Sequence, residues 1–355
     1  MSMAPQLRVR VMVVEDSLVV RQLLVHIIAS DPRLVVAAAV GSAEEALREI
    51  GRIRPDVISM DIRLPGMDGL EATRRIMAEQ PTPIVVIADS IEDSSLKISM
   101  NALRAGALTV VEKPVGLSSD GYAAIAGTIC TQLYIMSQVP VVRQRAFTPW
   151  REAAAPRRDP EWSTTRPSIM GIAASTGGPP ALAKILGALP PDFPLPILLV
   201  QHMGAPFMEG FASWLNGLVP LEVRLAQDQE TPIPGRVYVA PGDRHLLLSS
   251  AGTLKLSAEP PLGNQRPSAT MLFQSMARSL GRRSLGVILT GMGEDGAQGL
   301  VELRQAGGYA VAEDESTAVV YGMPAAAARM GGVNVSVPLD MIAPRILRLA
   351  RGDGE

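Results

Sequence analysis

The segment GIAASTGG at residues 171–178 places a serine, Ser175, directly after an apolar run that begins at residue 168. Two prolines follow the segment, and then an apolar, helix-like stretch that reaches Leu189. This order predicts a buried strand, a sharp turn and a helix. The turn would lift the Ser175 hydroxyl out of the sheet, beside the free backbone N–H groups of the helix start. A nucleophilic serine needs this arrangement, but a glycine turn that binds phosphate or only ends the strand fits the segment equally well.

The composition bounds what the protein can be. Its 355 residues suffice for two domains, and 47% of them are hydrophobic, so both domains can bury a core. The net charge of -2 argues against nucleic acid as an electrostatically bound partner. The single cysteine, Cys130, excludes an internal disulfide. No apolar stretch is long enough to span a bilayer, and no signal-peptide core is present, so we expect a soluble, cytoplasmic protein without membrane insertion.

Residues 8–137 alternate short apolar runs with helix-like segments. The runs typical of buried strands are 9–14, 35–40, 56–60, 84–87 and 108–111. The segments predicted as helices are 17–30, 43–50, 70–79, 94–105 and 120–136. This alternation predicts an α/β domain with a doubly wound parallel sheet, and five short strands suit the flavodoxin-like order 2-1-3-4-5. A ligand would then bind at the carboxyl ends of the first and third strands.

Charged side chains follow these strands where the ligand crevice is expected. Glu15 and Asp16 follow the first strand, Asp61 follows the third, and Lys113 follows the fifth. Carboxylates that lie together repel one another unless a cation neutralises them, and an all-oxygen site suits Mg²⁺. A magnesium ion and an ammonium group beside one aspartate are what phosphoryl transfer to that carboxylate requires.

These positions resemble the signature of a response-regulator receiver domain. The matching segments are ED at 15–16, DIRLPGMDG at 61–69 and KP at 113–114. The resemblance implies that Asp61 accepts phosphate from a histidine kinase and that Lys113 takes part in the switch. It also implies that Mg²⁺ is held by Asp16, Asp61 and the Arg63 carbonyl, with Glu15 assisting, and that the peptide bond before Pro114 is cis.

Two positions depart from that family. Receivers usually carry serine or threonine at the end of the fourth strand, whereas this chain has Ala88, followed by Asp89. They usually carry an aromatic or large residue three positions before the lysine, where this chain has Val110. The missing hydroxyl normally hydrogen-bonds the phosphoryl group and draws its loop inward. We therefore expect phosphorylation of Asp61 to activate the protein less than is usual in the family.

The alternation stops between residues 138 and 167. This stretch is rich in proline and holds more arginine than acidic residues, which is typical of an extended, fairly stiff linker. Its arginines could contact an acidic surface, although a solvated linker is the simpler explanation. Trp150 and Trp162 could dock on one of the domains.

Residues 168–350 predict a second doubly wound, mostly parallel sheet, Rossmann-like in type. Strands are expected at 169–174, 197–201, 236–239, 285–290, 309–312 and 333–337. Helices are expected at 180–189, 207–218, 268–280, 297–306 and 339–349. Apolar runs at 237–240, 246–249 and 254–256 predict a β-hairpin inserted in the middle of this domain.

This domain offers a histidine and an acidic residue as candidate partners for the serine, each with one rival. His202 directly follows a predicted strand, at the sheet edge where Ser175 is expected, so we favour it as general base over His245, which lies in the turn before the hairpin. Asp295 follows another strand and could orient the imidazole, with Glu294 as the alternative acid. A purely structural alternative for Asp295 is that it caps the helix that follows.

The set Ser175, His202 and Asp295 resembles the catalytic residues of the protein-glutamate methylesterases of bacterial chemotaxis. The matching segments are ASTGG at 174–178, QHM at 201–203, YVAPGDRH at 238–245, RPS at 266–268 and LTGMGEDG at 289–296. The resemblance implies a Ser-His-Asp triad, an oxyanion donor in the Met292 backbone and a supporting Thr176. It further implies hydrolysis of methyl esters and deamidation of glutamines on methyl-accepting chemotaxis receptors, regulated by phosphorylation, with no cofactor for the hydrolysis itself.

Two other function classes compete with this one. A non-enzymatic signalling adaptor stays open, because a sequence does not show that the three side chains meet. A transcription regulator is disfavoured, because no helix-turn-helix pattern or basic recognition helix follows the linker.

Overall fold

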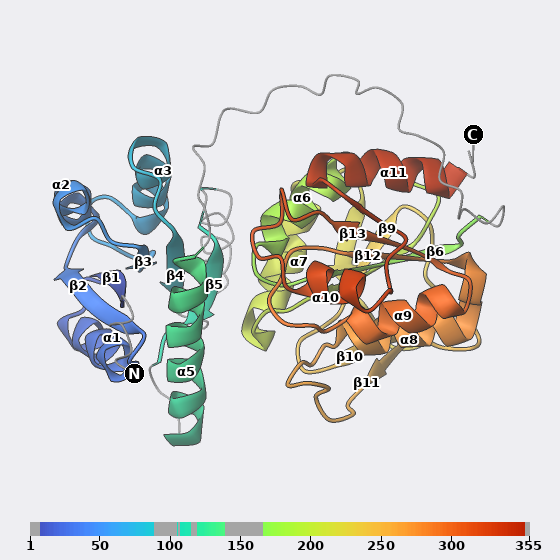
Figure 1. The fold of residues 1–355 in the computed structure, drawn as a ribbon, viewed down its shortest axis with the longest axis horizontal. Coiled ribbons are helices and arrows are strands. Elements are labelled where there is room, and N and C mark those ends of the chain that lie inside the picture. Colours follow the sequence, from blue (N-terminus) through green and yellow to red (C-terminus); the bar gives the residue numbers. More distant parts are fainter. Residues whose placement is uncertain (1–7, 89–104, 106, 115–118, 139–165, 352–355) are drawn as a thin grey trace, which may run out of the picture. The chain divides into compact units, whose positions relative to one another are not determined.

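The computed structural model describes residues 8–88, 105, 107–114, 119–138 and 166–351 (Figure 1). The chain separates into two compact units, Met1–Trp150 and Arg151–Glu355. The predicted linker, with Trp150 and Trp162, lies almost entirely outside the described residues, so the domain limits 8–137, 138–167 and 168–350 stay predictions. Within the described ranges, no helix has the length and apolar character needed to cross a membrane.

The first unit contains a five-stranded parallel sheet in the order β2-β1-β3-β4-β5, which confirms the predicted order. The strands are β1 (Val9–Val14), β2 (Leu34–Val40), β3 (Val57–Met60), β4 (Ile84–Ala88) and β5 (Thr109–Glu112). Strands β3 and β4 are buried along their whole length, and β1 nearly so, because helices cover both faces of the sheet.

Four described helices surround this sheet: α1 (Leu18–Ser30), α2 (Ala43–Ile53), α3 (Gly69–Glu79) and α5 (Ser119–Met136). The first three begin at side-chain caps, Ser17, Ser42 and Asp68, each of which accepts a hydrogen bond from a backbone N–H three residues further on. Helix α1 packs beside α5, and α2 beside α3 (Figure 1). The helix expected at 94–105 falls outside the described residues except for its last one.

The second unit contains a seven-stranded sheet in the order β14-β13-β12-β6-β7-β9-β8, and every neighbouring pair is parallel. Its strands are β6 (Ile169–Ala174), β7 (Ile197–Gln201), β8 (Glu222–Leu225), β9 (Arg236–Val239), β12 (Ser284–Ile288), β13 (Tyr309–Glu313) and β14 (Val335–Val337). The predicted hairpin is present as the antiparallel pair β10 (His245–Leu248) and β11 (Leu254–Ser257).

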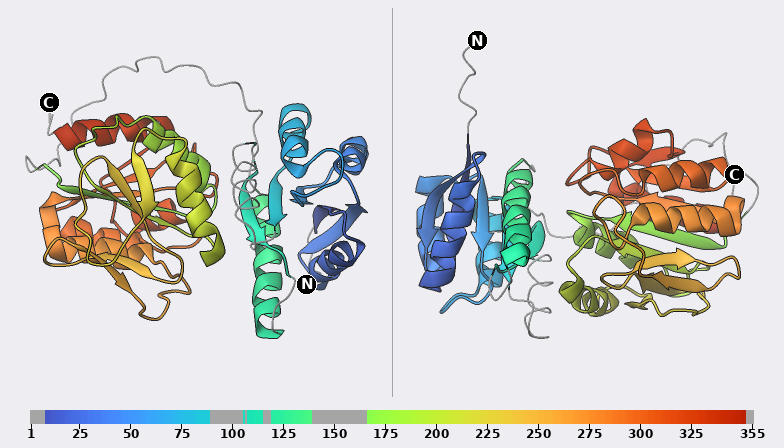
Figure 2. Two further views of the ribbon diagram at one scale, coloured as in Figure 1. Left: turned by 180° about the vertical axis from the view of Figure 1, so that it is seen from behind. Right: turned by 90° about the horizontal axis from the view of Figure 1, so that it is seen from below.

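Helices cover both faces of this second sheet (Figure 2). They are α6 (Gly178–Gly187), α7 (Met208–Asn216), α8 (Ala269–Leu280), α9 (Ala297–Gln305), α10 (Met323–Arg329) and α11 (Leu339–Arg351). Helix α8 packs against both α9 and the hairpin strand β10. Leu246 and Leu254 of the hairpin therefore share one buried cluster with Leu272 and Phe273 of α8.

Several details differ from the prediction. Strand β8 and helix α10 were not expected. The helix expected at 207–218 is instead a short 3₁₀ turn, η1 (Ala205–Phe207), followed by α7, because the chain enters it through Gly204 and Pro206. The cis peptide bond among the described residues precedes Pro267; the bond before Pro114 is not cis, contrary to expectation.

Candidate functional site

Ser175 lies in the turn between β6 and α6 and is half-buried. Gly177 makes this turn possible: its φ is 76°, and a Cβ there would lie 2.5 Å from the Cβ of Val319. The Ser175 N–H donates to the Thr290 carbonyl (3.0 Å), and the Gly178 N–H donates to the Ser175 carbonyl (2.9 Å). The serine is thus held at the carboxyl edge of the sheet, as the sequence predicted.

His202 and Asp295 meet at this same edge. His202 directly follows β7, and its backbone N–H donates to the Ala174 carbonyl (2.9 Å). Its Nε2 lies 2.9 Å from Oδ2 of Asp295, and the side chains are only 7% and 10% exposed. The other ring nitrogen, Nδ1, is buried and has no hydrogen-bond partner in the described part of the chain. Among those residues, no hydrogen bond joins the Ser175 hydroxyl to the imidazole.

The Asp295 carboxylate is anchored by the first turn of α8 and does not cap α9. It accepts hydrogen bonds from the Ser268 hydroxyl (2.8 Å) and from the backbone N–H groups of Ala269 (2.7 Å) and Thr270 (3.0 Å). Burial alone would raise the pKa of Asp295, but the contacts with His202 and with these backbone donors lower it to about 2. The carboxylate is therefore ionised at neutral pH and oriented toward the imidazole.

The alternative residues lie outside this cluster. His245 is fully buried; its Nδ1 accepts from the Ser268 N–H (3.2 Å), and its Nε2 lies 3.2 Å from the Pro260 carbonyl oxygen. Both nitrogens are therefore engaged, and His245 links the hairpin to the start of α8. Glu294 is exposed to solvent. The structure thus brings His202 together with Asp295, whereas neither His245 nor Glu294 belongs to this pair.

The two supporting residues predicted for the site lie beside the serine turn. Thr176 is buried, and its carbonyl accepts a hydrogen bond from Oγ1 of Thr290 (2.8 Å). Met292 is 44% exposed on the loop between β12 and α9. This loop contacts the serine closely, since a Cβ on Gly291 would lie 2.7 Å from the Cβ of Ser175. The backbone next to Met292 is therefore adjacent to the Ser175 side chain.

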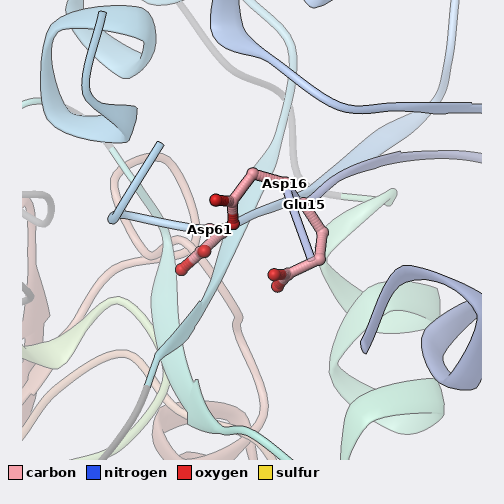
Figure 3. A group of neighbouring side chains, drawn as sticks. All are labelled: Glu15, Asp16 and Asp61. Atoms are coloured by element: carbon pink, nitrogen blue, oxygen red, sulfur yellow. The ribbon is translucent and has the colours of Figure 1, made fainter. Parts of the chain in front are cut away.

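The first unit holds the predicted acidic pocket (Figure 3). Ligand oxygens of Glu15, Asp16 and Asp61 all lie within 4.8 Å of one another. The Lys113 Nζ lies 3.0 Å from both Glu15 Oε2 and Asp61 Oδ2, so all four predicted side chains converge. Glu15, Asp61 and Lys113 are buried, whereas Asp16 is exposed at the mouth of the pocket.

The charges in this pocket favour binding of a cation. Burial and the neighbouring Asp61 raise the pKa of Glu15 to about 7, although Lys113 acts in the opposite direction. Burial likewise raises the pKa of Asp61 against the influence of Lys113. One ammonium group therefore does not fully offset two buried carboxylates. The all-oxygen donor set suits a hard divalent cation such as Mg²⁺.

The switch region shows the two departures noted in the sequence. Ala88 ends β4 and is buried, and its carbonyl accepts a hydrogen bond from the Lys113 N–H (3.0 Å). Val110 is half-buried on β5. Asp89 lies outside the described residues.

Comparison with known proteins agrees with both halves of this description. Residues 170–346 match the family model of the CheB methylesterase, and residues 11–119 match that of the response regulator receiver domain. The chain is 54% identical over 348 residues to protein-glutamate methylesterase/protein-glutamine glutaminase 2 of Paramagnetospirillum magneticum, with 97% of this chain and 98% of that protein covered. It is 45% identical over 351 residues to the corresponding protein 4 of Myxococcus xanthus, with 97% and 98% covered.

Among solved structures, the crystal structure of the Thermotoga maritima CheB methylesterase catalytic domain is similar to the second unit. It is 37% identical in sequence with a TM-score of 0.50, and the match covers 52% of this chain and 100% of that one. The chain therefore belongs to the CheB-type protein-glutamate methylesterase/protein-glutamine glutaminase family, with a receiver domain and a methylesterase domain.

Proposed function

We propose that this enzyme removes methyl groups from glutamate side chains of methyl-accepting chemotaxis receptors, with Ser175, His202 and Asp295 as its catalytic triad. The observation that carries this proposal is the contact between His202 and Asp295 at the sheet edge that also presents Ser175. A buried, ionised carboxylate that contacts a histidine beside a serine turn is suited to acyl transfer through a serine nucleophile.

In this mechanism, Ser175 Oγ attacks the ester carbonyl carbon and its proton passes to His202. Because Nε2 is engaged with Asp295, the accepting nitrogen is Nδ1. The imidazole then gives this proton to the departing methoxy oxygen, and methanol leaves an acyl-enzyme. Water attacks the acyl carbon, its proton passes to Nδ1 and on to Ser175 Oγ, and free glutamate is released. A glutamine side chain would follow the same route with ammonia as the leaving group.

The separation between Ser175 and His202 in the free protein is compatible with this route. Catalytic hydrogen bonds are often formed only once substrate is bound. The Met292 N–H, on the loop that contacts Ser175, would donate to the carbonyl oxygen as negative charge develops there. Thr176 would support the turn through its hydrogen bond with Thr290.

The receiver would regulate this activity. We propose that Asp61 takes a phosphoryl group from a chemotaxis histidine kinase, while Lys113 contacts a phosphoryl oxygen from its position beside Asp61. Mg²⁺ held by Glu15, Asp16 and Asp61 would offset the charge of the transferred group. Because Ala88 supplies no hydroxyl, the phosphate would shift the switch equilibrium less than in receivers that carry serine or threonine there.

Methanol release from methylated receptor tests the proposal. We expect Ser175→Ala to abolish release, while Ser168→Ala, which removes a hydroxyl at the opposite end of β6, leaves it unchanged. We expect Asp61→Asn to retain basal release and to lose its response to an acyl-phosphate donor. Wild-type release by Ser175→Ala would refute the triad.

A further inference from the structure

The side chain of Gln201 connects the serine turn to the histidine turn. Its Nε2 donates one hydrogen to the Ser175 carbonyl (2.8 Å) and the other to the His202 carbonyl (3.0 Å), and the residue is 1% exposed. We propose that Gln201 is a positioning residue that sets the separation between Ser175 and His202 during the reaction. This inference rests on the triad proposed above.

The orientation of the amide follows from its contacts. Both N–H groups of the Gln201 amide donate to carbonyl oxygens. If the amide were flipped, Oε1 would lie against these two carbonyl oxygens, and none of the three atoms could donate a hydrogen. Oε1 points instead toward the start of α6, where a Cβ on Gly178 would lie only 2.2 Å away. Gly178 is therefore required if Gln201 is to reach both turns.

Stability of the fold does not account for this arrangement. Oε1 of Gln201 is buried and accepts no hydrogen bond from any described residue. A buried polar atom without a partner is costly in free energy, and such atoms are found where another requirement outweighs the cost. Here the requirement is the link between the two residues that exchange a proton.

The position of Gln201 explains why a side chain must make this link. Strands β6 and β7 are paired as far as Ala174 and Gln201, and beyond them the His202 N–H still reaches the Ala174 carbonyl (2.9 Å). Past this point the chains enter separate turns, and the ladder of backbone hydrogen bonds ends. The Gln201 amide adds one more connection at the level of the reacting residues.

A second side chain holds the serine turn from the other side. Thr290, after β12, accepts the Ser175 N–H at its carbonyl and donates its hydroxyl to the Thr176 carbonyl (2.8 Å). None of the hydrogen bonds that Thr290 makes to described residues reaches His202, so Thr290 holds the serine turn without bonding the histidine turn. The Gln201 side chain hydrogen-bonds both turns, and a displacement of about 1 Å between reacting groups can cost roughly 100-fold in rate.

The test uses the full-length chain with methylated receptor as substrate. We expect Gln201→Met, which keeps the length but removes both donors, to lower kcat about 10- to 100-fold with a KM change below about threefold. Covalent labelling of Ser175 by a fluorophosphonate, located by peptide mass spectrometry, should slow by a similar factor. Ser284→Ala is the matched control, because it removes a buried side-chain hydrogen bond (3.1 Å, to the Met276 carbonyl) at the opposite edge of the sheet. We expect it to lower the unfolding midpoint without changing kcat more than about twofold.

Two further variants separate positioning from folding. Gln201→Glu is of equal size, and its carboxyl can donate a hydrogen only when protonated, so its activity relative to wild type should rise as the pH is lowered from about 8 to about 6. Gly178→Ala keeps Gln201, but the added Cβ would clash with the Gln201 amide oxygen. We therefore expect this variant to lose as much kcat as Gln201→Met.

Wild-type kcat and labelling rate in Gln201→Met or Gly178→Ala, with Ser175→Ala inactive, would overturn the role of Gln201 and leave the triad intact. Activity of Ser175→Ala, or a label on another residue, would instead overturn the triad itself.

Discussion

The Nε2 atom of His202 lies 2.9 Å from Oδ2 of Asp295, a residue that follows a different strand of the sheet. The same carboxylate is held by the first turn of α8 through the N–H groups of Ala269 and Thr270. Three segments distant in sequence therefore fix one imidazole, and Nδ1 is left as the nitrogen that would accept a proton from Ser175 in the proposed mechanism.

Replacing Asp295 tests the triad role proposed for it. We expect Asp295→Asn to lower kcat about 10³- to 10⁴-fold, because the neutral amide neither stabilises the imidazolium nor holds the same tautomer. Glu294→Gln is the matched control, since Glu294 is exposed next to it in sequence, and it should keep wild-type methanol release. If Glu294→Gln lowered kcat strongly and Asp295→Asn did not, the carboxylate that orients the imidazole would be Glu294.

The anchored carboxylate also predicts how stability depends on pH. The pKa of Asp295 falls from 3.8 to about 2 in the folded protein, so its contribution is present above pH 3.8 and is lost as the pH falls through about 2. The shift corresponds to roughly 2 kcal/mol. In urea unfolding of the catalytic unit, the difference in free energy of unfolding between wild type and Asp295→Asn should become smaller between about pH 4 and about pH 2. A gap that stays constant over this range would contradict the assignment.

The receiver pocket predicts an unusual effect of removing a carboxylate. Because the pKa values of Glu15 and Asp61 are both raised, the ionised pair opposes folding when no cation is bound. In the presence of EDTA we expect Asp61→Asn to raise the unfolding midpoint of the receiver unit. Added Mg²⁺ should raise the midpoint of wild type but not that of Asp61→Asn. A lower midpoint for Asp61→Asn in EDTA would show that Lys113 already offsets both charges.

A substitution of Ala88, the residue at the end of β4, can test whether the switch is weaker than is usual in receivers. We expect Ala88→Thr to increase the ratio of esterase rates measured with and without an acyl-phosphate donor, because the hydroxyl can bond the phosphoryl group. Ala88→Val has the same shape without the hydroxyl, and should not increase this ratio. If both variants changed this ratio equally, the change would come from packing at this buried position and not from the hydroxyl.

Two glycines of the serine turn and its helix provide a stability test. Gly177→Ala should destabilise the catalytic unit by about 1–3 kcal/mol, because φ is 76° and the new Cβ would lie 2.5 Å from Val319. A Cβ added at Gly187, at the end of the same helix, would have no atom within 4 Å. Gly187→Ala should therefore stabilise the catalytic unit by up to about 1 kcal/mol. Denaturant titration of both variants checks this, and equal effects would contradict the strain argument.

Much of the fold follows from local patterns in the chain. Fully apolar runs bounded by helix-like segments predict parallel strands buried on both faces, and the order of the receiver sheet was predicted correctly. Strand β8 was missed because its sequence, EVRL, is half charged, as suits an edge strand. Helix α10 was missed because seven residues, mostly alanine, carry no amphipathic period.

The candidate site divides in the same way. Ser175, His202, Asp61 and Lys113 could be placed from sequence, because residues after parallel strands gather at one edge of a sheet whatever the details of packing. The hydrogen bonds made by the side chains of Gln201 and Thr290 could not be predicted from sequence. They depend on the path that each turn takes after the backbone hydrogen bonds between the strands end. Local patterns in the chain therefore specify which groups reach the edge. The contact by which α8, 26 residues before Asp295, holds this carboxylate against His202 arises from packing, since hydrogen bonds between distant segments exist only once the layers have packed.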